Sequence, residues 1–382
     1  MHRHTGVGAS QWSKGFVTNI QSGSGKSDVI RVQLGQNAVW AITTVVITHE
    51  FSAGATLSKG LNRIMGTIVG GGLGILLTLI AQKVGGVGNS IIIGTSVFIF
   101  GAAATYTRMI PTIKKTFDYG IMILVLTFNM VVLSGLHCEK VIELVSARLS
   151  TIGIGIGICF FTSLIISPVW AGEDLHCALA SELDTLAHCI EGFFDEYFQQ
   201  SNEKEHQCGA IIDHSKEVLY ANSKDESLAS FAKWEPWHGN FGPSYPWKKY
   251  VQIGDDVREL AAVILSLKGC LQCPRETSSV LQQSFKEPCE TAAYSIAWTL
   301  QELAESIRKM KKCLPLSLIN PKLKTRRLEL NFVMSSKSSL LQDSDKLEIV
   351  SLVFLLMTMM EKAETLVKDV EELGELANFH PR

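Results

Sequence analysis

The pattern of apolar and polar positions divides the chain into two different halves. Long apolar runs are concentrated in residues 33–170, whereas most Asp, Glu, Lys and Arg residues fall in residues 171–382. The first half contains five apolar segments, at residues 36–51, 64–81, 90–106, 119–135 and 149–170. Each is near the ~20 residues that a spanning helix needs, although the first and third need flanking residues to reach that length. The pattern predicts a bundle of transmembrane helices.

The second half has the periodicity of amphipathic helices. In residues 173–198, apolar side chains recur every three or four positions from Leu175 to Tyr197, which places them on one helix face. Further helices are expected at residues 246–272, 277–312 and 345–374, with a loop and a short helix in residues 201–227. The apolar run at residues 349–360 is too short to cross a bilayer and is followed directly by charges. The sequence predicts an all-helical domain without strands.

Basic residues between the apolar segments predict the orientation in the membrane. The loop after the third segment carries Arg108, Lys114 and Lys115, while the loop after the second carries only Lys83. Because Lys and Arg favour the cytoplasmic side, the second half is expected in the cytosol. Five spans would leave the basic N-terminal segment outside. We therefore expect one further span before residue 36 that this chain lacks.

These features predict three parts and exclude several functions. We expect residues 1–33 to form a polar, disordered leader, residues 34–170 a multi-pass transmembrane domain in the lipid bilayer, and residues 171–382 a cytosolic helical domain. The net charge of −2 gives no sign of nucleic-acid binding. The nine cysteines are scattered, and Cys270 and Cys273 form a lone CxxC without a second pair, so no metal site is expected. No catalytic residue or cofactor motif is found, which disfavours an enzyme.

Three cations next to apolar segments are the candidate functional residues. Lys59 and Arg63 are four positions apart on one predicted helix face, and Arg148 begins the fifth segment. One interpretation is that these side chains reach individually to the lipid headgroups. The alternative, which we favour, is that they line a path for anions, because basic rings select anions in pores and few acidic residues are available to neutralise them.

An aromatic segment at residues 231–241, which we call the elbow, joins two predicted helices of the second half. Glu235 and His238 lie in it and raise the question of metal or acid–base chemistry. No second histidine and no nucleophile accompany them. We interpret the elbow as a structural turn fixed by Pro236 and Gly239.

Several of these segments resemble the plant aluminium-activated malate transporter family. The similar stretches are residues 37–46 (NAVWAITTVV), 50–63 (EFSAGATLSKGLNR), 105–108 with Pro111, 117–120 (FDYG), 148–152 (RLSTI) and 168–176 (PVWAGEDLH). The most specific is the elbow, which matches the family's WEP-x-HG signature. Its members are Trp234, Glu235, Pro236, His238 and Gly239. The resemblance covers residues 34–374. His49 departs from the pattern, which usually has an aromatic or apolar residue there.

This resemblance implies a homodimeric channel that passes malate and other anions down their electrochemical gradient. Family members have six membrane helices, the first of which is missing here, and place basic pore residues at positions matching Lys59, Arg63 and Arg148. Residues 191–198 (EGFFDEYF) look like a segment linked to regulation by 4-aminobutyrate, which makes Phe193, Phe194 and Tyr197 candidate regulatory residues; core packing explains them equally well. Either the plasma membrane or the vacuolar membrane fits, and the preferred anion and the gating signal stay open.

The missing helix leaves an alternative function open. The chain would then be a truncated, non-conducting subunit that associates with full-length channel partners and regulates them. A membrane-bound enzyme is the weaker alternative, since no catalytic motif supports it.

Overall fold

The computed structural model describes residues 41–134, 138–165, 168–198, 205–242, 244–272, 279–313, 316–337 and 343–381. The predicted leader at residues 1–33 lies outside these ranges. The chain divides into two compact units. The first contains residues up to Glu50 and Thr56–Ile166, and the second contains Phe51–Ala55 and Ser167–Arg382. Each unit is described by itself.

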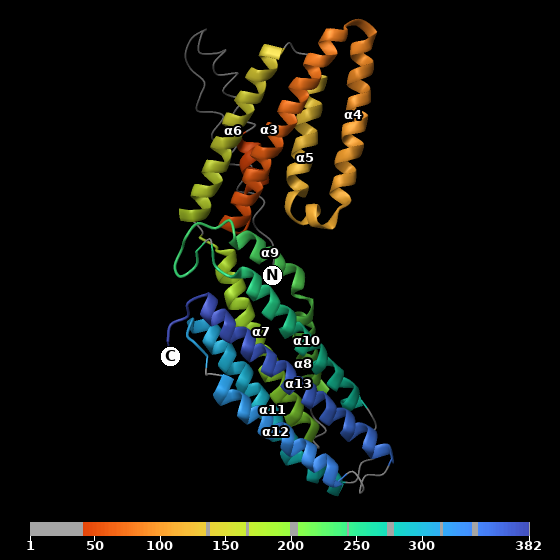
Figure 1. Cartoon of the computed structure of the whole chain (residues 1–382), viewed down its shortest axis with the longest axis vertical. Coiled ribbons are helices and arrows are strands. Elements are labelled where there is room, and N and C mark those ends of the chain that lie inside the picture. Colours follow the sequence, from red (N-terminus) through yellow and green to blue (C-terminus); the bar gives the residue numbers. More distant parts are fainter. Residues whose placement is uncertain are drawn as a thin grey trace. The chain divides into compact units, whose positions relative to one another are not determined.

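The first unit consists of long helices that run alongside one another (Figure 1). They are α3 (Ala53–Val84), α4 (Gly86–Met109), α5 (Pro111–Leu133) and α6 (Cys138–Ile165), and residues 41–48 are also helical. The first turn of α3 belongs to the second unit. Glycines bring α3 close to α5, because a Cβ atom on Gly70 would lie 2.4 Å from the carbonyl oxygen of Leu124. Between apolar helices in lipid, such small residues allow tight backbone packing.

Three helices are long and apolar enough to cross a membrane, at Ala53–Val84, Gly86–Met109 and Val145–Ile165, and Phe117–Leu133 is a shorter apolar helix. They correspond to the second, third, fifth and fourth predicted segments. The described chain is therefore an all-helical membrane protein, as predicted. Helix α3 begins at Ala53, before the apolar segment predicted at residues 64–81, so Lys59 and Arg63 lie on one helix, as predicted. Of the first predicted segment, residues 41–48 are helical and residues 36–40 lie outside the described ranges.

The second unit is a bundle of helices around one apolar core (Figure 1). In chain order they are α7 (Ala171–Phe198), α8 (Glu205–Tyr220), α9 (Asn222–Ala232), α10 (Trp247–Gln272), α11 (Ser279–Lys309), α12 (Leu316–Lys337) and α13 (Asp343–Leu376). Helices α7, α10, α11 and α13 match predicted ones. The sequence analysis missed α12, where Pro321 and a basic stretch hide the buried face formed by Ile319, Leu323 and Leu330.

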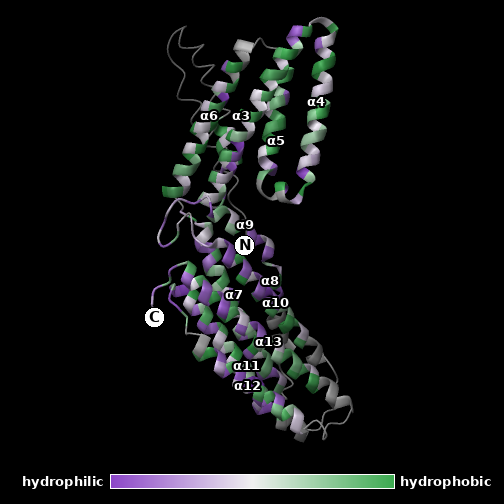
Figure 2. Ribbon diagram, in the orientation of Figure 1, coloured by the Kyte–Doolittle hydropathy of each residue, from purple (hydrophilic) through white to green (hydrophobic). Residues whose placement is uncertain are grey.

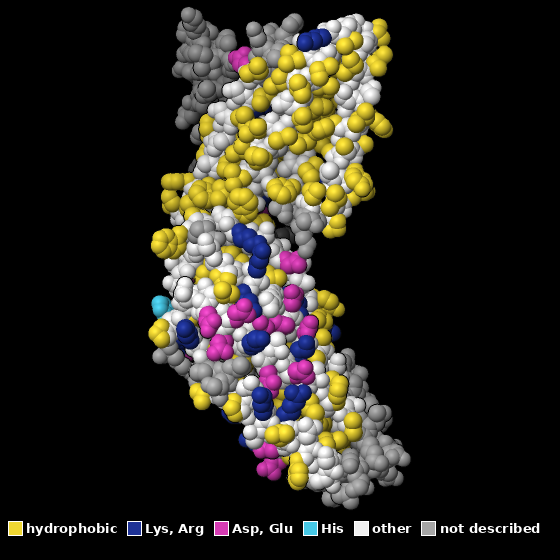
Figure 3. Space-filling view, in the orientation of Figure 1, with side chains coloured by type: hydrophobic (Ala, Val, Ile, Leu, Met, Phe, Trp, Pro, Cys, Tyr) yellow, Lys and Arg dark blue, Asp and Glu magenta, His cyan; other side chains and the backbone are white. Residues whose placement is uncertain are grey.

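The surface chemistry of the two units differs as their sequences predict. Hydropathy is high along α3–α6 and mixed along α7–α13 (Figure 2). On the face shown in Figure 3, charged side chains gather over the second unit and are sparse over the first. In the first unit, large apolar side chains are exposed, including Phe98 at 77% and Phe161 at 65%. An apolar surface of this kind is compatible with contact with lipid.

An ion network centred on Arg258 joins two helices of the second unit. Arg258 on α10 donates to Asp225 on α9 at 2.7 Å and to Asp255 at 2.7 Å. Glu182 on α7 lies beside this network, with Oε2 buried and without a hydrogen-bond partner in the described part of the chain. Burial, reinforced by the negative charge of Asp225, raises the pKa of the Glu182 carboxyl to about 7. Ionised Glu182 is therefore poorly accommodated.

Replacing Glu182 by glutamine should stabilise the protein at high pH. In the unfolded chain a glutamate ionises near pH 4.5, whereas in the folded protein Glu182 keeps its proton to about pH 7. Its destabilising effect is absent below pH 4.5, grows between these values and is complete above pH 7. We expect Glu182→Gln to raise the free energy of unfolding at pH 8 by at most about 3 kcal/mol and to change it little at pH 4.5.

Thermal unfolding of the purified protein at the two pH values measures this difference. Glu217→Gln is the matched control, since Glu217 is exposed on the neighbouring helix α8. A gain in stability that is equal at both pH values would contradict the proposed ionisation of Glu182.

Candidate functional site

Arg63 is a buried cation inside the first unit. It lies on α3, and only 7% of its surface is exposed. Its Nη1 group donates a hydrogen bond of 2.8 Å to the hydroxyl of Tyr119 on α5. Its Nε–H group is buried and has no hydrogen-bond acceptor among the described residues. A guanidinium group with an unsatisfied N–H is costly to bury, so this position is suited to an acceptor beyond those that the described side chains supply.

Lys59 lies one helical turn before Arg63. Unlike Arg63, it has an acidic partner among the described residues. Its ammonium group forms an ion pair with Glu50, and both side chains are about one-third exposed, at 36% and 26%. The ammonium nitrogen is 6.0 Å from the ring centroid of Tyr119, which also bonds Arg63. The structure therefore brings Lys59 and Arg63 together around one tyrosine. Glu50 offsets the charge of Lys59.

Arg148 on α6 is the third predicted pore residue. It is partly buried, and it is near enough to Arg63 for like-charge repulsion between the two guanidinium groups. Helix α6 also approaches α3 closely beyond Arg148, since a Cβ atom on Gly60 would lie 2.9 Å from the side chain of Ile156. Two cations on different helices thus share one electrostatic environment.

Buried hydroxyl groups add polarity to the interior of the first unit. The fully or nearly fully buried ones are Thr44, Thr48, Thr56, Thr67, Thr78, Thr127, Thr151 and Ser163. Several donate back to their own helix, as Thr67 does to the carbonyl oxygen of Arg63 at 2.8 Å. Others are unsatisfied within the described residues, namely Thr48 Oγ1 and Ser163 Oγ. Sequence analysis did not select these hydroxyls, although their position in apolar segments was visible.

Glu235 of the elbow holds the beginnings of two helices in the second unit. Its carboxylate accepts hydrogen bonds from the backbone N–H groups of Ala171 at 2.6 Å and Gly172 at 3.1 Å, at the start of α7. The N–H group of Gly54, in the first turn of α3, also donates to it. Burial raises the pKa of the Glu235 carboxyl, and these three N–H groups oppose the rise. A carboxylate suits both positive helix ends.

The rest of the elbow supports this carboxylate. The imidazole of His238 stacks on Trp170, with ring centroids 3.8 Å apart. Its Nδ1 donates to the carbonyl oxygen of Pro236 at 2.9 Å, since a carbonyl only accepts. Gly239 has a positive φ of 51°, which a glycine adopts without strain, in the tight turn that pairs His238 with Phe241. Trp234 is 41% exposed. The geometry suits a structural role for the elbow.

The candidate regulatory aromatics lie in the core of the second unit. Phe193, Phe194 and Tyr197 are each at most 3% exposed and pack against one another, with the rings of Phe193 and Phe194 5.2 Å apart. They are part of the apolar core that packs α7 against its neighbours. A regulatory role for them stays a prediction. Among the described residues no group of three His, Cys, Asp or Glu side chains is placed to hold a metal ion.

Comparison with known proteins identifies the family. The model of the aluminium-activated malate transporter family matches residues 29–374. The chain belongs to the aluminium-activated malate transporter family. It is 41% identical over 313 residues to aluminum-activated malate transporter 12 of Arabidopsis thaliana, covering 82% of this chain and 56% of that protein. For transporter 14 of the same plant, the identity is 39% over 317 residues, covering 82% and 58%.

A wheat relative shows the same similarity at a greater distance. Aluminum-activated malate transporter 1 of Triticum aestivum is 33% identical over 359 residues, covering 91% of this chain and 77% of the relative. The chain thus spans somewhat more than half the length of the Arabidopsis relatives above. Membership in the aluminium-activated malate transporter family agrees with the apolar helices of the first unit.

Proposed function

We propose that this chain is a subunit of an anion channel that passes malate and other organic or inorganic anions across a plant membrane. The observation that carries the proposal is Arg63. It is a buried guanidinium whose one bonded partner among the described residues is the neutral hydroxyl of Tyr119, and whose Nε–H has no acceptor. Relatives whose names describe malate transporters support the choice of anion.

Electrostatics explains why this arrangement favours anions. In a site of low effective dielectric constant, a unit charge attracts an opposite charge several-fold more strongly than in water. Arg63 and Arg148 repel one another, and an anion between them would relieve that repulsion. Lys59 is partly neutralised by Glu50, so the binding stays weak enough for release. Buried hydroxyls such as Thr48 offer further donors in place of lost hydration.

The proposal extends to the surroundings and the assembly of the protein. The exposed apolar helices of the first unit would lie in the bilayer of the plasma or vacuolar membrane, with the second unit in the cytosol. Two copies of the chain would form the channel. Binding of malate needs no metal ion or cofactor in this scheme.

Reconstitution of the purified chain into liposomes tests the proposal. We expect a malate gradient to drive a current whose reversal potential follows the anion and not the accompanying cation. The mass of the detergent-solubilised particle measures the number of chains. If correctly inserted protein carries no anion current, the channel proposal is wrong. Restoration of a current when a full-length relative is added would then support the regulatory-subunit alternative.

A further inference from the structure

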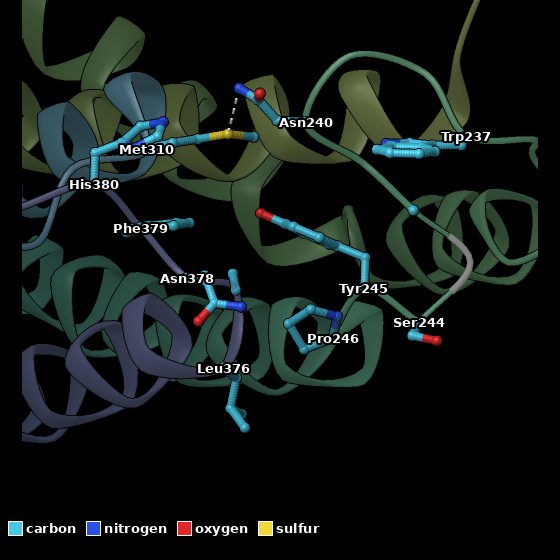
Figure 4. A pocket seen from close by; sticks show the side chains of 12 residues that line it. Trp237, Asn240, Ser244, Tyr245, Pro246, Met310, Leu376, Asn378, Phe379 and His380 are labelled. Carbon is cyan, nitrogen blue, oxygen red and sulfur yellow. Dashed lines mark hydrogen bonds between the residues drawn. The ribbon is translucent and has the colours of Figure 1, made fainter.

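A cavity of about 460 Å³ lies in the second unit. Its walls come from six residues that follow Glu235, from Met310 after α11, and from residues 376–380 at the end of α13 (Figure 4). The six are Trp237, Asn240, Gly242, Ser244, Tyr245 and Pro246. The volume is in the usual range for sites that bind small molecules. Neither the anion pathway nor the contacts of Glu235 uses these residues.

The backbone around the cavity is held in an unusual conformation. Met310 and Asn378 are the two non-glycine residues with positive φ in the described part of the chain, at 49° and 53°, and both line the cavity. Each follows a helix end, and the chain beyond is joined by two hydrogen bonds of 2.9 Å, from His380 N to Met310 O and from Lys312 N to His380 O. A methionine in this conformation costs about 1–2 kcal/mol. Two of the lining residues therefore have a specific left-handed backbone conformation, and hydrogen bonds join the two chain segments that carry them.

The aromatic side chains of the cavity are of two kinds. Tyr245 and Phe379 are held in place or buried, whereas Trp237 is exposed to solvent. The hydroxyl of Tyr245 bonds that of Tyr250 at 3.1 Å, and Tyr250 bonds Nδ1 of His176 at 2.7 Å, so the Tyr245 ring is held in place. Phe379 is buried at 4% exposure. Trp237 by contrast is 81% exposed and presents its indole to solvent at the rim (Figure 4). An open aromatic face of this kind can stack on another ring.

The polar groups of the cavity carry hydrogen bonds without formal charge. Asn240, Asn378, Ser244 and His380 line it, and none of its lining residues is Asp, Glu, Lys or Arg. The amide of Asn240 donates to the sulfur of Met310 at 3.2 Å, as the dashed line in Figure 4 shows. Because a thioether is a weak acceptor, a ligand oxygen or nitrogen would be a better partner for this amide. An anionic ligand would find no Lys or Arg side chain here, and a cationic ligand would find no carboxylate.

We propose that this cavity binds an uncharged, planar heteroaromatic molecule with a hydrogen-bonding edge. The ring stacks on Trp237 at the rim, and its edge bonds the amides of Asn240 and Asn378. Nucleobases, nucleosides and pyridine carboxamides have this chemistry and fit the volume. Phosphorylated forms are disfavoured because the lining residues include no Lys or Arg side chain. Malate and other carboxylates are excluded from this site for the same reason.

Adenosine is a suitable probe for the full-length chain in lipid nanodiscs. It has about 19 non-hydrogen atoms, and typical efficiencies for ligands of this size give a dissociation constant on the order of 100 µM. Quenching of tryptophan fluorescence measures binding, because Trp237 would stack on the probe. Adenosine monophosphate should bind no more tightly than adenosine, and citrate should not bind at this site.

Three variants test whether the binding is at this cavity. Trp237→Ala should weaken adenosine binding about tenfold through loss of stacking, measured by calorimetry. Ser244→Trp should abolish it by filling the cavity without removing a wall. Tyr220→Ala is the matched control, since Tyr220 is 76% exposed on α8 and does not line the cavity. All three sites are exposed, so we expect the same unfolding temperature as for the unchanged chain.

The possible results separate clearly. Binding that is lost in the first two variants and kept in the third supports the site. The proposal is overturned by absence of binding up to about 10 mM adenosine. It is also overturned if all three variants bind alike, or if the monophosphate binds more tightly than adenosine. None of these results depends on transport, so failure here would leave the channel proposal untouched.

Discussion

Replacing Arg63 by glutamate is expected to abolish the anion selectivity of the channel. The change puts a negative charge where a buried guanidinium now has an unsatisfied N–H. At about 4 Å and an effective dielectric constant near 20, each unit of charge contributes roughly 4 kcal/mol, so its reversal should lower anion permeability by at least about 100-fold. Reversal potentials of liposomes in a potassium malate gradient measure this permeability ratio.

Two further variants separate charge from folding in this experiment. Arg63→Lys keeps the positive charge but loses the fork of donors, so it should retain selectivity with a smaller current. Lys83→Glu is the matched charge reversal, since Lys83 is exposed at the far end of the same helix α3. It should leave selectivity unchanged. If correctly inserted Arg63→Glu protein still prefers anions to the same extent, Arg63 does not line the path.

The identity of these cations was predictable from the sequence, whereas their partners were not. Lys59 and Arg63 stand out because a charge in an apolar helix is costly and because their spacing places them on one face. Tyr119 lies 56 positions from Arg63 and bonds it only because α3 and α5 pack together. That contact depends on glycines such as Gly66, whose added Cβ would lie 2.5 Å from the carbonyl oxygen of Gly120. Periodicity within one helix does not specify its neighbour.

The helices of the second unit show the same limit. Residues 173–198 were predicted well because one strong apolar stripe forms the buried face of α7. Helix α12 was missed, since its buried positions Ile319, Leu323 and Leu330 are interrupted by Pro321 and by basic residues. These positions are buried only because α12 packs against α11 and α13 in the folded protein. Local pattern thus sufficed for helices with a wide apolar face and failed for a narrow one.

The elbow was predicted as a turn, but the sequence did not indicate which groups the carboxylate of Glu235 contacts. Glu235 is 4% exposed and meets backbone N–H groups from residues more than sixty positions earlier. Gly54 is needed nearby, because a Cβ atom there would lie 2.3 Å from the carbonyl oxygen of Phe231 and 2.8 Å from Cγ of Glu235. A signature motif therefore marks a long-range hydrogen-bond requirement, which no local pattern encodes.

Replacing Glu235 by alanine should strongly destabilise the second unit. The change leaves buried N–H groups of Ala171, Gly172 and Gly54 without their acceptor. Loss of charge-assisted hydrogen bonds and burial of unpaired donors should together lower the free energy of unfolding by about 4 kcal/mol. For a unit of this size we expect the unfolding temperature to fall by about 10 °C. Thermal unfolding followed by tryptophan fluorescence measures the shift.

Comparison variants distinguish helix capping from a general effect of mutation. Glu235→Gln keeps one acceptor oxygen but turns an amide donor toward the other N–H, so its loss should be about half as large. Gly54→Ala should destabilise by a separate route, through steric conflict with Phe231 and Glu235. Glu217→Ala, at an exposed position on α8, should leave the unfolding temperature nearly unchanged. If Glu235→Ala unfolds at the same temperature as Glu217→Ala, the carboxylate does not stabilise the two helix ends, and the elbow must matter for another reason.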